Sequence, residues 1–158
     1  EDLGERMKVN PNALASINSY VSTFANEPTV PTSGCAAGCS QADLVTYDLA
    51  AWKKTVKDTL PLGKAAVFIP PAGQSSQLGV LIAWRENERD TSTTYKDQID
   101  ATKVRAADGS LSDGGGTDTA TNACPADHTC HLQYIAVSAR CAPYKPGTGA
   151  AQYFCPGA

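Results

Sequence analysis

The stretch from Ser40 to Leu60, SQADLVTYDLAAWKKTVKDTL, decides the fold. Its large apolar residues recur at intervals of three or four, which is the spacing of one face of an α-helix. At 100° per residue they fall within an arc of about 80°. The arc contains Val45, Leu49, Trp52, Val56 and Leu60, and the opposite side carries Thr46, Lys53, Lys54 and Lys57. The pattern predicts an amphipathic helix over 40–60 with one buried face.

Both ends of this helix carry their own signals. Ser40, with Asp43 three residues later, resembles a capping box, in which side chains satisfy the free N–H groups of the first turn. Pro61 and Gly63 do not continue a helix comfortably, so we expect the helix to end near Leu60.

The hydrophobic period changes from 3.6 to 2 after this helix. Residues 65–69, AAVFI, form a short apolar run closed by two prolines. Between Gln77 and Arg85, the apolar residues Leu78, Val80, Ile82 and Trp84 alternate with their neighbours. Two such strands joined by a loop are typical of an antiparallel hairpin. Residues 131–140 predict a third strand.

Ahead of the helix, residues 1–9 offer only a thin apolar stripe, Leu3 and Met7, which is too narrow for a core helix. The chain opens with helical composition and no start signal, so we expect its start to be a cut through a longer helix. After Asn10 and Pro11, apolar residues at 14, 17, 21 and 24 continue a helical spacing. The pattern predicts a kinked N-terminal helix whose end occupies residues 1–26.

These elements together predict an α+β fold, in which the end of an N-terminal helix and a second helix pack on a small antiparallel β-sheet. A length of 158 residues favours a single domain over 1–158, with the sheet and its loops in residues 65–158. Only 27 of the 158 residues are Leu, Ile, Val or Phe, which is a lean aliphatic core. Disulfides would supply the missing rigidity.

The cysteines provide the material for those disulfides. They are six in number: Cys35, Cys39, Cys124, Cys130, Cys141 and Cys155. The even number and the absence of a C-x-x-C redox motif indicate disulfides, for which fifteen pairings are formally possible. The spacing does not choose among them, and nearest-neighbour pairing is our working prediction. Cys124 would then close a turn with Cys130, and Cys141 would close the tail with Cys155.

Two kinds of metal site are alternatives to these assignments. A zinc site would use Cys124, His128, Cys130 and His131. Four ligands this close along the chain would not readily surround one ion. A calcium site would use Asp108, Asp113 and Asp118 of a glycine-rich loop, where the spacing of an EF-hand is absent. We therefore expect neither a metal nor another cofactor, and the three aspartates remain the calcium candidates.

Several classes of function lack their signatures in this sequence. It has no G-x-S-x-G, H-E-x-x-H or P-loop motif, and bridged cysteines would leave no thiol nucleophile, so we expect no enzyme activity. Thirteen basic and 16 acidic residues give a net charge of -3, which argues against nucleic-acid binding. No stretch approaches the 18 or so consecutive apolar residues of a membrane-spanning helix.

Some short segments resemble a known family. They are ERM at 5–7 followed by NP at 10–11, YDLAAWK at 47–53, LPLG at 60–63 and AWRE at 83–86. They resemble the corresponding segments of type IV pilus modification proteins, the PilV-type minor pilins. The resemblance covers about residues 1–20 and 41–86. Its specific part is the Tyr-Asp-Leu-Ala-x-Trp helix followed by Leu-Pro-x-Gly and a strand that ends in Trp-Arg-Glu.

The resemblance implies a pilin-like head that takes part in the initiation of type IV pilus assembly, at or near the pilus tip. It implies roles in twitching motility and surface attachment, with other minor and major pilins as partners. The family's apolar N-terminal half-helix, which holds such subunits in the inner membrane of Gram-negative cells before assembly into the extracellular pilus, is missing here. Under this interpretation the first helix meets neighbouring subunits through Leu3, Glu5, Arg6 and Met7.

Two alternative functions remain open from the sequence. A minor pseudopilin of a type II secretion system would have the same fold in a different filament. A calcium-dependent adhesin or ligand-binding head would use the Asp- and Gly-rich loop instead.

Overall fold

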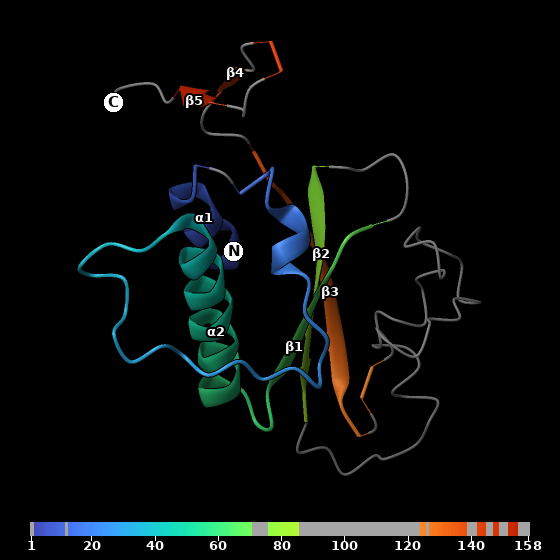
Figure 1. The fold of residues 1–158 in the computed structure, drawn as a ribbon. Coiled ribbons are helices and arrows are strands. Elements are labelled where there is room, and N and C mark those ends of the chain that lie inside the picture. The colour runs from blue at the N-terminus through green and yellow to red at the C-terminus, as the bar shows by residue number, and fades with distance from the viewer. Residues whose placement is uncertain are drawn as a thin grey trace.

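Two α-helices lie on one face of a three-stranded antiparallel sheet in the computed structural model (Figure 1). The structure describes residues 2–11, 13–70, 76–85, 124–125, 127–138, 142–144, 147–148 and 152–154. The predicted α+β class is confirmed, with helices, an antiparallel sheet and disulfide-bonded cysteine pairs.

Helix α2 (Gln41–Thr59) begins and ends within one residue of its predicted range. Ser40 Oγ accepts a hydrogen bond from the Asp43 N–H at 3.2 Å and donates one to the Asp43 carboxylate at 2.7 Å. At the other end the Leu60 N–H donates to the Val56 carbonyl at 3.0 Å. The apolar arc is buried at Val45, Leu49, Trp52 and Val56. Both the capping signal and the helical period are therefore confirmed.

The sheet contains β1 (Lys64–Phe68), β2 (Gln77–Trp84) and β3 (Thr129–Ala136), paired antiparallel in that order. The predicted hairpin and third strand are confirmed, although β3 begins and ends earlier than the predicted range of 131–140. The register places Phe68 opposite Gly79, and Gly79 opposite Tyr134.

Both faces of the sheet carry buried apolar side chains. On the face toward the helices, Val67 and Val80 join a core cluster with residues of α1 and α2. On the other face, Phe68 and Leu81 belong to a second cluster. The alternation in the sequence of β2 identified only the first face, because the intervening residues are apolar or small as well. These intervening residues are Gly79, Leu81 and Ala83.

The N-terminal segment is not the kinked helix that the spacing predicted. Helix α1 (Asp2–Val9) is followed by a turn, then by the short 3₁₀ helix η1 (Ile17–Tyr20), and then by extended chain. Ser22 pairs with Val67 at the edge of β1 through two backbone hydrogen bonds, of 2.9 and 2.7 Å. The helical spacing fails here because the backbone of residue 22 bonds to the sheet, which requires an extended conformation.

Helix α1 contributes to the core despite its thin apolar stripe. Leu3 and Met7 are 2% and 3% exposed and belong to the core cluster that contains Val45 and Leu49 of α2. The expectation that this stripe is too narrow for a core helix is therefore wrong. Two side chains four residues apart suffice because α1 packs directly on α2 (Figure 1).

The tail, which the sequence analysis described only by its cysteines, contains two short strands. Strands β4 (Ala142–Tyr144) and β5 (Gln152–Phe154) form a separate antiparallel hairpin beyond one end of the main sheet (Figure 1). The predicted disulfide between Cys141 and Cys155 lies outside the described residues. Within the described ranges, neither helix combines the length and the apolar content that crossing a bilayer requires.

Candidate functional site

The turn between α2 and β1 holds an exposed leucine in an unusual backbone conformation. The Gly63 N–H donates to the Leu60 carbonyl at 2.9 Å and closes a four-residue turn. Its third residue, Leu62, has φ 50°, a position where such turns normally require glycine. The turn has its glycine at position 63 instead. A Cβ there would lie 2.3 Å from the Val56 carbonyl oxygen, so only glycine fits at this position. Leu62 is thus a residue with a Cβ in the left-handed region, where such residues are uncommon.

Two contacts from the sheet hold this turn in place. The Arg85 N–H donates to the Pro61 carbonyl at 2.9 Å. The ring nitrogen Nε2 of His128 lies 3.2 Å from the Leu62 carbonyl oxygen. The side chain of Leu62 is 60% exposed. The backbone of residue 62 is thus fixed from both sides, which is the condition under which a strained conformation persists.

A cavity of about 470 Å³ adjoins this turn. Its walls are the extended segment after η1, the last turns of α2 and the start of β1. The lining residues are Phe24, Glu27, Pro28, Thr29, Val30, Lys53, Lys54, Lys57, Asp58, Gly63, Lys64 and Ala65. The volume lies in the range of ligand-sized pockets, and the lining combines apolar residues with four lysines and two carboxylates.

The charges around the cavity leave an excess of positive charge. Lys57 Nζ lies 2.5 Å from the Glu27 carboxylate, and Lys54 Nζ lies 2.5 Å from the Asp58 carboxylate. The hydrogen bond and charge of Lys57 lower the pKa of Glu27, and the charges of Lys64 and Lys53 lower it further. Since each carboxylate is paired with one lysine, two positive charges remain. The cavity is therefore cationic in a chain whose net charge is -3.

Lys53 is built into the wall of this cavity. It is 6% exposed, and its ammonium donates to Ser22 Oγ at 3.0 Å, to the Thr23 carbonyl at 2.8 Å and to the Asn26 carbonyl. Burial lowers the pKa of Lys53 to about 8, although the charge of Glu27 acts in the opposite direction. Lys53 thus fastens the extended segment to α2.

The sequence interpretation placed Lys53 on the polar side of the helix, so it missed this role. A signal was present, because residues seven apart are separated by only about 20° around a helix, which puts residue 53 beside Leu60 at the margin of the apolar arc. A long side chain at such a margin can bury its stem and still bring its charge to polar partners.

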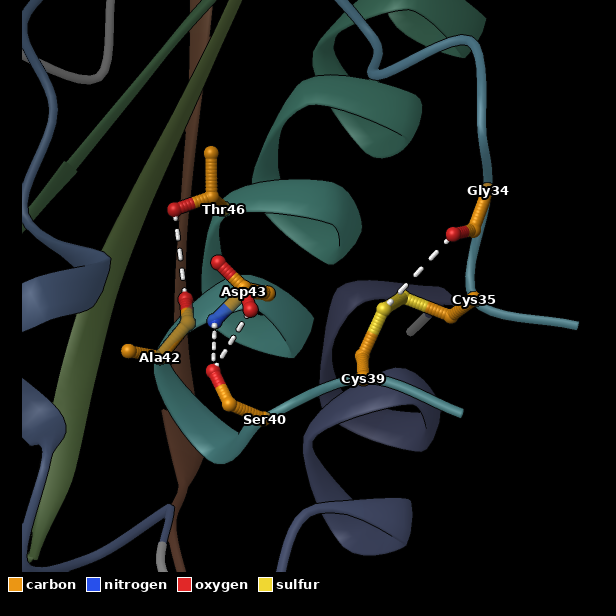
Figure 2. Close-up of a disulfide and its surroundings, with 7 residues drawn as sticks. All are labelled: Gly34, Cys35, Cys39, Ser40, Ala42, Asp43 and Thr46. Carbon is orange, nitrogen blue, oxygen red and sulfur yellow. Dashed lines mark hydrogen bonds between the residues drawn. A yellow bond between two sulfur atoms is a disulfide. The ribbon is translucent and has the colours of Figure 1, made fainter. Parts of the chain in front are cut away.

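Nearest-neighbour pairing is confirmed for the two disulfides in the described part of the chain. Cys35 and Cys39 are joined in the loop that leads into α2, with an S–S distance of 2.14 Å and the capped first turn beside them (Figure 2). Cys124 and Cys130 are joined ahead of β3 at 2.02 Å. Cys39 is exposed, whereas Cys130 is 2% exposed. The first disulfide is accessible to solvent and the second is part of the core.

A second polar group is buried between the helices. Asp48 of α2 is 5% exposed, and its Oδ2 has no hydrogen-bond partner among the described residues. Burial raises the pKa of Asp48, the charge of Arg6 lowers it and the charge of Asp2 raises it. Nearby, Asn10 Nδ2 donates to the hydroxyl of Tyr20 at 3.2 Å. Burial is also the main reason why the pKa of Tyr20 is raised.

The four residues expected to meet other subunits separate into two pairs. Leu3 and Met7 are buried inside this chain. Glu5 is exposed and pairs with Lys8 at 2.6 Å, and the partly exposed Arg6 bonds Asp2 at 3.0 Å. A partner that contacts α1 in this conformation would therefore meet the charged side of the helix.

Some of the residues considered as metal ligands lie in the described part of the chain, and others lie outside it. Cys124 and Cys130 are bonded to each other, so their sulfurs are not thiolate ligands for a zinc ion. In the described part of the chain, no group of three or more His, Cys, Asp or Glu is arranged to hold a metal ion. The calcium candidates Asp108, Asp113 and Asp118 lie outside the described residues.

Comparison with family models, with curated proteins and with solved structures gives no match to this chain.

Proposed function

We propose that this chain is the head of a minor pilin that takes part in the assembly of a type IV pilus. One observation carries the proposal. Two of the segments that resemble the PilV-type pilins, at 60–63 and 83–86, meet in space, because the Arg85 N–H directly after β2 donates to the Pro61 carbonyl. Helix α2, which carries the segment at 47–53, leads directly into the turn at 60–63. The resemblance thus coincides with a contiguous part of the fold.

The arrangement of α1 supports the same proposal. Leu3 and Met7 dock this helix on α2, which leaves Glu5 and Arg6 on its outer side. A helix held in this way could continue upstream as the shaft of a filament subunit, with its charged side toward neighbouring major and minor pilins. The subunit would reside in the inner membrane before assembly and on the cell surface afterwards, where it would support attachment and twitching motility. No catalytic role is part of the proposal.

The test uses the full-length gene in its own cells. Deletion should reduce the number of surface pili, and the full-length protein purified from the membrane should bring other pilin-like subunits with it. Wild-type pilus numbers after deletion would contradict the proposal. Co-purification with subunits of a secretion apparatus, together with loss of secretion, would instead identify the chain as a minor pseudopilin.

Charge reversal on α1 examines the contact face separately. Glu5→Lys combined with Lys8→Glu should lower the pilus number without unfolding the head, because both side chains are exposed and the exchange keeps their ion pair with its charges reversed. Normal piliation in this variant would remove α1 from the interface.

A further inference from the structure

A buried carboxyl group lies where α1 packs on α2. Asp48 is three residues from Val45 and four from Trp52, which puts it on the buried face of α2. It is 5% exposed, and its Oδ2 is enclosed without a hydrogen-bond partner among the described residues. A neutral carboxyl group can be buried at modest cost, whereas an ionised one requires hydrogen bonds, a counter-charge or water. The charge of Asp48 therefore affects how firmly the two helices pack.

The charged groups of α1 do not fully compensate an ionised Asp48. Arg6 favours the ionised carboxylate, whereas the charge of Asp2 opposes it. Arg6 Nε already donates to the Asp2 carboxylate at 3.0 Å. The remaining charges of α1, Glu5 and Lys8, are exposed and form an ion pair with each other. Burial outweighs the effect of Arg6, so the pKa of Asp48 is raised.

The other two elements that pack on α2 are η1 and β1, and each brings one titratable residue. In η1 this residue is Tyr20, whose hydroxyl accepts a hydrogen bond from Asn10. Burial raises the pKa of Tyr20, so this hydroxyl stays neutral at physiological pH. In β1 the residue is Lys64, which lines the cavity beside Asp58 in the last turn of α2. Arg6 is thus the cation of these elements that acts on Asp48.

Helix α1 depends on this packing. It has eight residues, and a helix of that length is not stable alone in water. Its buried residues are Leu3 and Met7, and both of its described ion pairs join residues within α1. Loss of the packing would therefore unfold α1, and the sheet could stay intact.

We propose that the protonation state of Asp48 controls the docking of α1: the helix stays on α2 while Asp48 carries its proton, and it detaches more often once Asp48 is ionised. The step is the loss of one proton from Asp48 to solvent, after which the carboxylate gains water when α1 moves away. The inference does not depend on the proposed function, because both helices belong to this chain.

The direction of the effect follows from linkage between the proton and the docked state. The docked state holds the proton more tightly than the detached state, in which Asp48 meets water. Docking is therefore firmest below pH 3.8, the ordinary pKa of aspartate, and weakens as the pH rises through the raised pKa of the docked state.

The first experiment measures amide hydrogen exchange in the purified chain, with rates divided by those of an unstructured peptide at the same pH. At pH 7 the amides of residues 6–9 should be about tenfold better protected in Asp48→Asn than in the wild type, the effect of one unsatisfied buried polar group. At pH 3 the two proteins should agree. Asp58→Asn, an exposed aspartate on the same helix, is the matched control and should behave as the wild type. Equal protection of α1 in Asp48→Asn and wild type at pH 7, or an equal difference at both pH values, would overturn the inference.

Low concentrations of urea distinguish detachment of α1 from unfolding of the whole chain. In the wild type at pH 7, exchange at residues 6–9 should be faster than at residues 49–56 of α2. It should also respond less to urea, because detachment of one short helix exposes little surface. The same protection and the same urea response in both helices would show that α1 does not detach on its own, which contradicts the inference.

A second variant keeps the test decisive if Asp48→Asn does not fold. Arg6→Gln removes the charge that favours the ionised carboxylate in the docked state, so it should lower the protection of α1 several-fold at pH 7 and leave it unchanged at pH 3. Lys8→Gln is the control, because it breaks the other ion pair of α1. Equal effects of the two variants at pH 7 would mean that Arg6 compensates no ionised carboxylate here, and the inference would fall.

Discussion

The ring of Phe68 lies directly over the backbone of Gly79 on the neighbouring strand. A Cβ on Gly79 would stand 2.1 Å from the ring Cζ and 2.4 and 2.6 Å from the two Cε atoms. The ring of Tyr134, from the strand on the other side, meets the ring of Phe68 edge to face with centroids 6.3 Å apart. The glycine in the central strand thus makes room for an aromatic pair that spans all three strands.

Gly79→Ala should therefore lower the free energy of unfolding by about 1–3 kcal/mol, because the ring of Phe68 must move out of a packed cluster. Gly4→Ala is the matched control. A Cβ on Gly4 meets nothing within 4 Å, and alanine in a helix should raise stability by about 0.5–1 kcal/mol. Urea unfolding monitored by circular dichroism measures both changes. Equal stability of Gly79→Ala and wild type would refute the close packing described here.

Lys53→Met should detach the extended segment from α2. The substitution leaves the Thr23 and Asn26 carbonyls without their donor, and we expect a loss of about 1–3 kcal/mol at pH 7. Lys54→Met on the same helix is the control, since an exposed ion pair contributes about 0–1 kcal/mol. Amide hydrogen exchange at residues 22–26 should increase only in the first variant. Unaltered protection there would mean that Lys53 does not fasten this segment.

The pH dependence of stability tests the burial of Lys53 independently. Its pKa is about 8 in the folded chain, compared with 10.5 for an ordinary lysine. Between these values the unfolded chain binds more protons than the folded chain, so the free energy of unfolding should rise with pH from about 8 to 10.5. Lys53→Met should remove this rise. A wild-type profile without it would contradict the lowered pKa.

Asp48 should make the free energy of unfolding fall with increasing pH in the acidic range, whereas Lys53 makes it rise in the alkaline range. Burial raises its pKa in the folded chain, so the unfolded chain releases this proton first as the pH increases. The stability contributed by the neutral form is complete below pH 3.8 and decreases as the pH rises through the folded-state value. Asp48→Asn should therefore be more stable than wild type at pH 7 but not at pH 3, with the exposed Asp58→Asn as control. A variant that is less stable at pH 7 would show that the carboxylate is required in its charged form.

The two described disulfides should respond differently to reductant. Cys39 is exposed, whereas Cys130 is buried in the second apolar cluster, so a low concentration of dithiothreitol should open the first bridge before the second. Alkylation followed by mass spectrometry identifies the released thiols. The double variant Cys35→Ser/Cys39→Ser should lose about 2 kcal/mol, the entropy of a five-residue loop. Simultaneous reduction of both bridges would contradict this order.

The sequence alone determined the elements whose signals are local. The apolar arc and the Ser40 cap specify helix α2, the change of hydrophobic period specifies strands β1 and β2, and the working prediction of nearest-neighbour pairing matches the two described disulfides. These features depend on residues within a few positions of one another. Periodicity, capping and loop closure act over that distance, so they are visible without the fold.

Only the tertiary structure decided what depends on distant neighbours. Ser22 is extended because Val67 offers it a backbone partner at the edge of the sheet, and Lys53 is buried because three oxygens of the segment after η1 surround its ammonium. Leu62 has a left-handed backbone in a turn that the Arg85 N–H and the His128 ring contact from residues far away in the sequence. In each case the free energy of a remote contact outweighs the preference of the local sequence. The turn at 60–63 and the lysine-lined cavity beside it depend on such contacts.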